Sequence, residues 1–211
     1  MAEESTEVEE KKDEPTMSVP EETYMTCGAH IGTRQKTADI KDFIYKVRND
    51  GLYIIDVKKT DERIKNAAKF ISKYDPNDVL IVSVRQYGQK PIKILAENTG
   101  IQLLDGRFRP GTLTNPKSEG FLEPALLIVT DPLADAQALH EAENIGIPVV
   151  GLCDTNNETK FLDIVIPTNN KGRRALALVY WLLTREILKE KGKIKSYDDF
   201  KLEIEDFEAE I

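Results

Sequence analysis

The feature that most constrains this chain is a regular alternation of short apolar runs with segments of helical periodicity. Continuous apolar runs rich in β-branched residues are typical of parallel strands buried on both faces. When such strands alternate with amphipathic helices, a mostly parallel sheet covered by helices on both faces is favoured. We therefore expect an α/β fold whose strands are Val79–Val84, Ile101–Leu104, Ala125–Val129, Ile147–Cys153 and Asp163–Ile166.

Capping and turn residues predict what lies between these strands. Asp50-Gly51, between two apolar runs, is a strong signal for a β-hairpin that precedes the sheet. Helices are expected where a capping residue or a proline precedes the periodic segment and a glycine follows it. The predicted helices begin at Thr60 as a cap, cover Pro91–Asn98, follow the Asp131-Pro132 pair as far as Gly146, and run from Lys171 to near Gly192.

Charge is unevenly distributed along the 211 residues, whose net charge is -8. Residues 1–22 hold nine acidic and two basic side chains, and residues 196–211 hold seven acidic and one basic. The segment between them is therefore basic, and a binding surface responds to such local charge. We expect an acidic disordered tail over residues 1–22, one domain over residues 23–192, and an acidic C-terminal tail over residues 193–211.

Several classes of protein are disfavoured. Cys27 and Cys153 are isolated, so neither a disulfide framework nor a zinc site is expected, and a reduced intracellular setting is the simplest interpretation. The acidic start does not resemble a signal peptide, and the longest apolar run, Ala175–Leu183, is about half of a membrane span. We expect no cofactor, no metal and no membrane partner.

Basic side chains follow several of the predicted strands. The carboxyl ends of parallel strands meet at one edge of the sheet, where ligands bind in such folds. A further basic loop, His30–Thr37, follows the first helical segment. The cations that we expect to contact RNA phosphates are Arg34, Lys36, Arg85, Arg107, Arg109, Lys171, Arg173 and Arg174.

The segment Gly106–Asn115 carries the strongest of these signals, because Arg107 and Arg109 flank Phe108. Guanidinium groups grip phosphates in a planar fork, and aromatic rings stack on bases. The alternative is a surface loop whose arginines pair with nearby carboxylates. The cations from Lys171 onward would likewise disfavour a helix start by a few tenths of a kcal/mol, unless an anion binds there.

Signals for catalysis are weak. No standard phosphate-binding loop motif follows any predicted strand, and His30-Ile31-Gly32-Thr33 matches only part of the H-x-G-H motif of nucleotidyl transferases. Asp131 is interpreted as a helix cap. A nucleotide-binding enzyme with its site at the strand ends and a pure protein-interaction module remain the alternatives to an RNA-binding protein.

Longer stretches of the chain resemble the small-subunit ribosomal protein S2 family, in its archaeal and eukaryotic branch. They include GAHIGTRQKT from Gly28, GRFRPGTLTNP from Gly106 and IPTNNKGRRALALVYWLL from Ile166, and with others they cover nearly all of residues 24–192. The resemblance implies a Rossmann-like three-layer sandwich and a structural, non-enzymatic role in the cytoplasm. The expected partners are small-subunit ribosomal RNA and neighbouring ribosomal proteins, with no small-molecule substrate.

Overall fold

A five-stranded, wholly parallel sheet forms the centre of the molecule. The computed structural model describes residues 17–104 and 106–210, so most of the predicted acidic tail, residues 1–16, lies outside the described residues. The strands run in the spatial order β4-β3-β5-β6-β7, which confirms the predicted α/β sandwich. Their bounds are β3 (Val79–Val82), β4 (Gln102–Leu103), β5 (Leu126–Val129), β6 (Val149–Cys153) and β7 (Ile164–Pro167).

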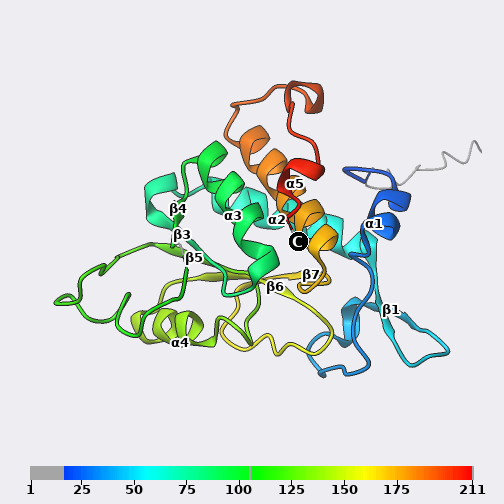
Figure 1. The fold of residues 1–211 in the computed structure, drawn as a ribbon, viewed down its shortest axis with the longest axis horizontal. Helices are drawn as coiled ribbons and strands as arrows, with labels where there is room; N and C mark the ends of the chain where they lie inside the picture. The colour runs from blue at the N-terminus through cyan, green and yellow to red at the C-terminus, as the bar shows by residue number, and fades with distance from the viewer. Residues whose placement is uncertain (1–16, 105, 211) are drawn as a thin grey trace, which may run out of the picture.

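Helices cover both faces of this sheet, as Figure 1 shows. One face carries α2 (Val57–Ser72), α3 (Gln86–Thr99) and α5 (Arg173–Glu190), and the other carries α4 (Ala136–Ile145). Successive strand residues point to opposite faces. Val79 and Ile81 of β3 therefore pack with the three helices, whereas Leu80 and Val82 pack with α4. Both sets are buried, which explains why the strands are apolar without interruption.

The N-terminal part of the described chain forms a smaller unit beside the sheet. Helix α1 (Glu21–Cys27) leads through a loop and a short 3-10 turn, η1 (Lys41–Phe43), into a hairpin. The hairpin strands β1 (Ile44–Val47) and β2 (Tyr53–Ile55) pair in antiparallel fashion. Gly51 in the turn has a φ of 83°, a conformation that glycine adopts without strain. The predicted hairpin is therefore confirmed.

Several helices begin at residues other than those predicted. Asp56 caps α2 by accepting from Lys58 N, and Thr60 lies inside the helix, where its hydroxyl donates to Pro167 O at 2.7 Å. Asp135 precedes α4 at its N-cap position, so Asp131 is not the cap of that helix. In each case two residues of good capping type lie four apart, and the helix begins after only one of them.

Helix α3 begins at Gln86, well before the predicted start at Pro91. Gly88, expected in a loop, lies in its first turns, and a Cβ there would meet Ser83 Oγ at 2.4 Å. The glycine therefore allows the start of α3 to pack directly against the end of β3. Earlier in the chain, the short 3-10 turn η2 (Pro76–Asp78) leads directly into β3.

The C-terminal segment packs along α5. It contains two 3-10 turns, η3 (Tyr197–Asp199) and η4 (Glu205–Phe207). Phe207 is completely buried in the same core as α5, and Trp181 Nε1 donates to Leu202 O at 2.7 Å. Within the described ranges, none of the helices has the combined length and apolar character of a membrane-spanning segment.

Candidate nucleic-acid interface

The register of the sheet gathers the strand ends at one edge. Val82 of β3 is opposite Val129 of β5, and Cys153 of β6 is opposite Pro167 of β7. Because the strands are parallel, the segments that follow them leave the sheet on the same side. Arg85, Asp131, Asp154 and Lys171 all lie in these segments.

A chain of polar contacts runs along this edge. Arg85 Nε donates to Asp131 Oδ2 at 2.8 Å, and Asp131 Oδ1 accepts from Asn157 Nδ2 at 2.9 Å. The Oδ1 atom of Asn157 in turn accepts from Asp154 N at 2.8 Å, and Asp154 Oδ2 lies 2.9 Å from Lys171 Nζ. Asp131 and Asp154 are buried, so Arg85 and Lys171 neutralise carboxylates that lack access to solvent.

These two cations therefore have a role in the fold itself. Their side chains remain 34% and 36% exposed, so each presents part of its charge at the surface. The main role of Arg85 and Lys171 is to hold the strand-end loops together. Their ion pairs with Asp131 and Asp154 were not predicted from the sequence.

The segment 106–115 has a different arrangement. Arg107 and Arg109 are exposed, and within the described part of the chain neither guanidinium forms a hydrogen bond or an ion pair. Phe108 is buried, with Leu113, in the core beneath α4. The expectation that the Phe108 ring stacks on a base at the surface is therefore wrong. Instead, the ring anchors the loop, while the two arginines on either side of it remain exposed.

Glu141 of α4 fixes the backbone of this loop. Its carboxylate accepts from Gly111 N at 2.7 Å, from Leu113 N at 3.0 Å and from Thr114 Oγ1 at 3.2 Å. Gln137 Nε2 also donates to it at 2.8 Å. Burial alone raises the pKa of Glu141, but these hydrogen bonds outweigh burial and hold the pKa below its usual value. An ionised carboxylate thus holds the arginine-bearing loop in one conformation.

The loop that contains Arg34 and Lys36 lies against the end of β6. Thr33 N donates to Thr155 Oγ1 at 2.9 Å, and Gly32 approaches so closely that a Cβ would meet Thr155 Cγ2 at 2.4 Å. Arg34 and Lys36 are both exposed. The ammonium group of Lys36 lies 5.2 Å from the centroid of the Tyr53 ring. These two cations therefore lie beside the loop that follows β6, at the same edge as Asp154.

Arg173 and Arg174 at the start of α5 are paired within the chain. Arg173 Nη2 lies 2.6 Å from Glu208 Oε1, and Arg174 Nε lies 3.4 Å from the same oxygen. Arg173 Nη1 also donates to Ala209 O at 3.2 Å. The basic start of α5 therefore does bind an anionic group, and that group is the Glu208 carboxylate of the acidic C-terminal segment.

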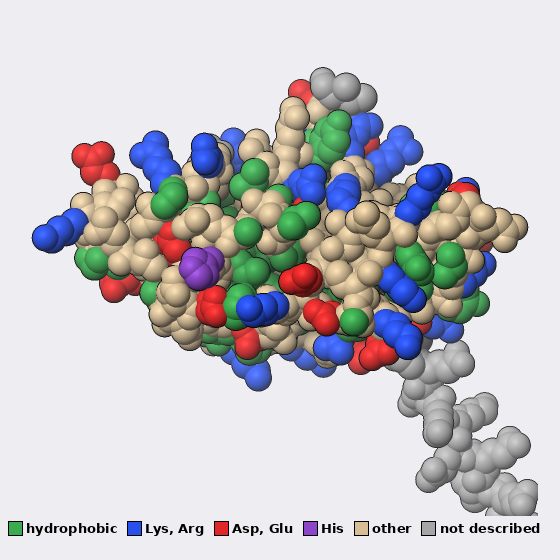
Figure 2. Space-filling model, turned by 90° about the horizontal axis from the view of Figure 1, so that it is seen from below, with side chains coloured by type: hydrophobic (Ala, Val, Ile, Leu, Met, Phe, Trp, Pro, Cys, Tyr) green, Lys and Arg blue, Asp and Glu red, His purple; other side chains and the backbone are tan. Residues whose placement is uncertain are grey.

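The eight predicted cations thus fall into three groups. Arg34, Lys36, Arg107 and Arg109 are exposed, and the described residues offer them no carboxylate partner. Arg85 and Lys171 pair with buried aspartates, and Arg173 and Arg174 pair with Glu208. On the face that bears α4, lysine and arginine side chains are scattered among carboxylates and apolar groups (Figure 2).

Two further carboxylates shape this region and were missed by sequence reasoning. Glu141 lies one turn from Ala138 and next to Ala142 on the buried face of α4, and a charged residue on that apolar face was the available signal. Asp135 is 2% exposed and accepts from Val84 N at 2.7 Å and from Asp131 N at 2.9 Å. It thereby ties the end of β3 to the end of β5.

Comparison with known proteins identifies the family of this chain. The model of the family described as ribosomal protein S2 matches residues 24–119 and 120–190. Small ribosomal subunit protein uS2 of Thermoplasma volcanium is 56% identical over 198 residues, which cover 94% of this chain and 100% of that protein. The uS2 protein of Methanoregula boonei is 55% identical over 193 residues, or 92% of this chain and 93% of its own length. The chain belongs to the ribosomal protein S2 family.

Proposed function

We propose that this protein is a structural, non-enzymatic constituent of the small ribosomal subunit, located with the ribosome in the cytoplasm. It binds small-subunit ribosomal RNA through the strand-end edge and touches neighbouring ribosomal proteins. Membership of the ribosomal protein S2 family supports the role. The observation that supports the RNA surface is the position of Arg107 and Arg109, which have no ion-pair partner among the described residues, on a loop anchored by Phe108 and Glu141.

Rigid mounting matters because binding costs conformational freedom. A long cationic side chain on a mobile loop must be ordered when it meets a phosphate, whereas a fixed loop has already lost that freedom. Arg34 and Lys36 lie on a second loop that is fixed through Thr33 and Thr155. Phosphate contacts from such cations release counterions, so affinity falls steeply as salt rises. The other four predicted cations act first within the protein and contribute less.

A binding assay with salt titration tests this proposal. Small subunits that lack the protein are mixed with the wild-type chain or with an Arg107→Ala/Arg109→Ala variant, and co-sedimentation is measured at several salt concentrations. If each arginine meets one phosphate, the variant binds more weakly, and the slope of log affinity against log salt falls by about 1.4–1.8.

A charge-matched control uses Lys69 and Lys201, both exposed. Lys69 lies in the last turn of α2, at the end of the helix remote from the strand-end edge. The Lys69→Ala/Lys201→Ala variant should keep the wild-type salt slope. A folded arginine variant with unchanged affinity and slope would contradict the RNA surface, and a failure of the wild-type chain to join subunits would contradict the function.

The hairpin offers a surface for a neighbouring ribosomal protein. Tyr45 and Val47 of β1 are large apolar side chains that are 69% and 54% exposed. Exposed apolar side chains of this kind are typical of a contact with another protein. A Tyr45→Ser/Val47→Ser variant should bind isolated ribosomal RNA normally but join subunits more weakly. Equal weakening in both assays would assign the hairpin to RNA instead.

A further inference from the structure

A cavity of about 500 Å³ opens beside the basic loop. After β3 the chain builds β4 on one side and then returns to build β5 on the other side of β3. In open parallel sheets the crevice outside the strand ends, at the point where the order reverses, is the usual ligand site. Val84 after β3 and Ala134 after β5 both line this cavity, so it lies at that point.

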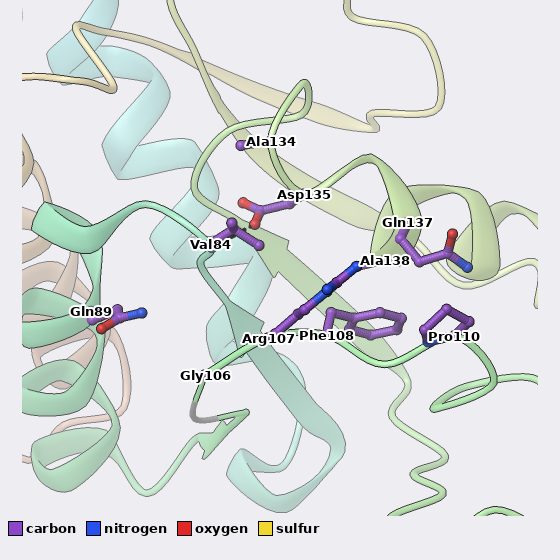
Figure 3. A pocket seen from close by; sticks show the side chains of 10 residues that line it. All are labelled: Val84, Gln89, Gly106, Arg107, Phe108, Pro110, Ala134, Asp135, Gln137 and Ala138. Carbon is purple, nitrogen blue, oxygen red and sulfur yellow. Dashed lines mark hydrogen bonds between the residues drawn. The ribbon is translucent and has the colours of Figure 1, made fainter.

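The cavity has apolar walls and a few converging polar groups. Val84, which is 46% exposed, lines the cavity together with Phe108 and Pro110. Figure 3 shows the Arg107 side chain extending between Val84 and Phe108 toward Gln137, with Asp135 beyond Val84. Mostly apolar linings of this size with a small number of polar groups are typical of sites for small organic groups.

The polar groups select the kind of ligand. The two oxygens of Asp135 accept from Val84 N and from Asp131 N, and the residue also lines the cavity. Burial raises the pKa of Asp135 to about 6, so at neutral pH the carboxylate is mostly ionised; it then repels a phosphate but can accept from the N–H groups of a neutral heterocycle. The exposed amide of Gln89 adds both a donor and an acceptor. The lining therefore suits a flat, neutral group with polar edges.

We propose that this cavity receives one unstacked base of single-stranded ribosomal RNA, while Arg107 and Arg109 hold the adjacent phosphates. The inference rests on the proposed function and deepens it. Sequence-tolerant phosphate contacts then bring the strand to the edge, and the inserted base fixes its register. Insertion of a base requires an unpaired nucleotide, so the site selects a loop, bulge or strand end over a continuous duplex.

Filling the cavity tests the proposal without changing any charge. Ala134 lines the cavity at a partly exposed turn position, so Ala134→Trp places an indole where the base would lie. Ala136, two residues further on, is exposed and lines a separate cavity on the other side of this turn. Ala136→Trp is therefore the matched control. Circular dichroism and thermal unfolding of both variants verify that they are folded.

The expected result distinguishes loss of the base contact from loss of the phosphate contacts. Ala134→Trp should weaken binding to RNA about 5- to 150-fold, the range for loss of one bound base, and should leave the salt slope unchanged. Ala136→Trp should bind as the wild type does. Equal binding by the two folded variants, or a fall in salt slope with Ala134→Trp, would overturn the base pocket while leaving the arginine surface intact.

Chemical probing of the RNA provides a second readout. In subunits that contain the wild-type protein, one unpaired base should be protected from a reagent that modifies its Watson–Crick edge, and Ala134→Trp should expose it. Titration with the four free nucleoside monophosphates tests the alternative that the cavity binds a free nucleotide. Saturable micromolar binding of one of them that ribosomal RNA does not compete with would make the cavity a small-nucleotide site and would overturn the proposal.

Discussion

Arg173 Nη2 lies 2.6 Å from Glu208 Oε1, so the first residue of α5 is ion-paired to the C-terminal segment. A helix N-terminus carries a partial positive charge, and Arg173 and Arg174 add to it. The carboxylate of Glu208 offsets this concentration of positive charge. It also occupies the position in which an RNA phosphate would meet the same two arginines.

Release of these arginines should strengthen RNA binding. In a Glu208→Gln variant the ion pairs are lost, while the amide oxygen can still accept a hydrogen bond. We expect RNA affinity to rise about 2- to 5-fold, which is of the order of the energy of a surface ion pair, and the salt slope to become steeper. Glu205→Gln makes the same charge change at an exposed position of η4 and should have no such effect. Equal binding of RNA by both variants would show that Arg173 and Arg174 hold the C-terminal segment and do not contact RNA.

Loss of the Phe207 ring should destabilise the protein. Phe207 is completely buried against α5, and deletion of a buried phenylalanine ring costs about 3–5 kcal/mol. Phe207→Ala should lower the free energy of unfolding by that amount in urea titrations and should expose residues 193–206 to proteases. Leu133→Ala, at a side chain that is 67% exposed, should change the stability by less than about 0.5 kcal/mol. A similar small effect for Phe207→Ala would show that the segment packs only loosely.

The architecture was largely predictable, because local signals coincide with the elements. Uninterrupted apolar runs identified the buried parallel strands, and Gly100 and Gly146, both with positive φ, end α3 and α4 as expected. The helix starts were less predictable. Asp56 and Thr60 are both good caps, and the hydrogen bond from Thr60 to Pro167 O, which joins distant parts of the chain, placed Thr60 inside the helix.

The availability of each cation could not be predicted from local sequence. Arg85 and Asp131 are 46 residues apart, and Arg174 and Glu208 are 34 apart. Composition places these groups in the same protein, but only the fold brings them together. Phe108 illustrates the same limit, because the sequence Arg-Phe-Arg does not indicate whether the aromatic ring faces solvent or the core.

Glu141 should make the stability of the basic loop depend on pH. In a Glu141→Gln variant one carboxylate oxygen is replaced by an NH₂ group that cannot accept from Gly111 N or Leu113 N. We expect a loss of about 1–3 kcal/mol at pH 7. The folded-state pKa lies below the ordinary value of 4.5, so the stabilisation is present above that value and is lost as pH falls through the lower folded pKa. Urea unfolding from pH 7 to pH 3 should therefore show a difference that shrinks below pH 4.5, and a constant difference would contradict this role.

Arg85 should matter for stability more than for RNA. Asp131 is completely buried, and both Nε and Nη2 of Arg85 donate to its Oδ2 atom. Arg85→Ala would leave this carboxylate unpaired, and such a loss costs about 3–5 kcal/mol. Arg85→Lys should have an intermediate effect, because the charge remains while one of the two hydrogen bonds is lost. Thermal and urea unfolding measure these differences, and Arg107→Ala is the comparison, since that exposed arginine should change stability by less than about 0.5 kcal/mol.

The double variant Arg85→Ala/Asp131→Asn identifies the cause of the loss. Removal of the buried charge along with its partner should recover part of the stability, because an asparagine oxygen can still accept from Asn157 Nδ2 and Leu133 N, as Asp131 Oδ1 does. Recovery would show that the cost of Arg85→Ala is the unpaired carboxylate. If the double variant is no more stable than Arg85→Ala, packing of the arginine stem and not its charge holds this edge. Arg85→Ala could also weaken RNA binding. If the double variant restores that binding, the weakening is an effect of folding, and Arg107 and Arg109 remain the arginines that contact phosphate.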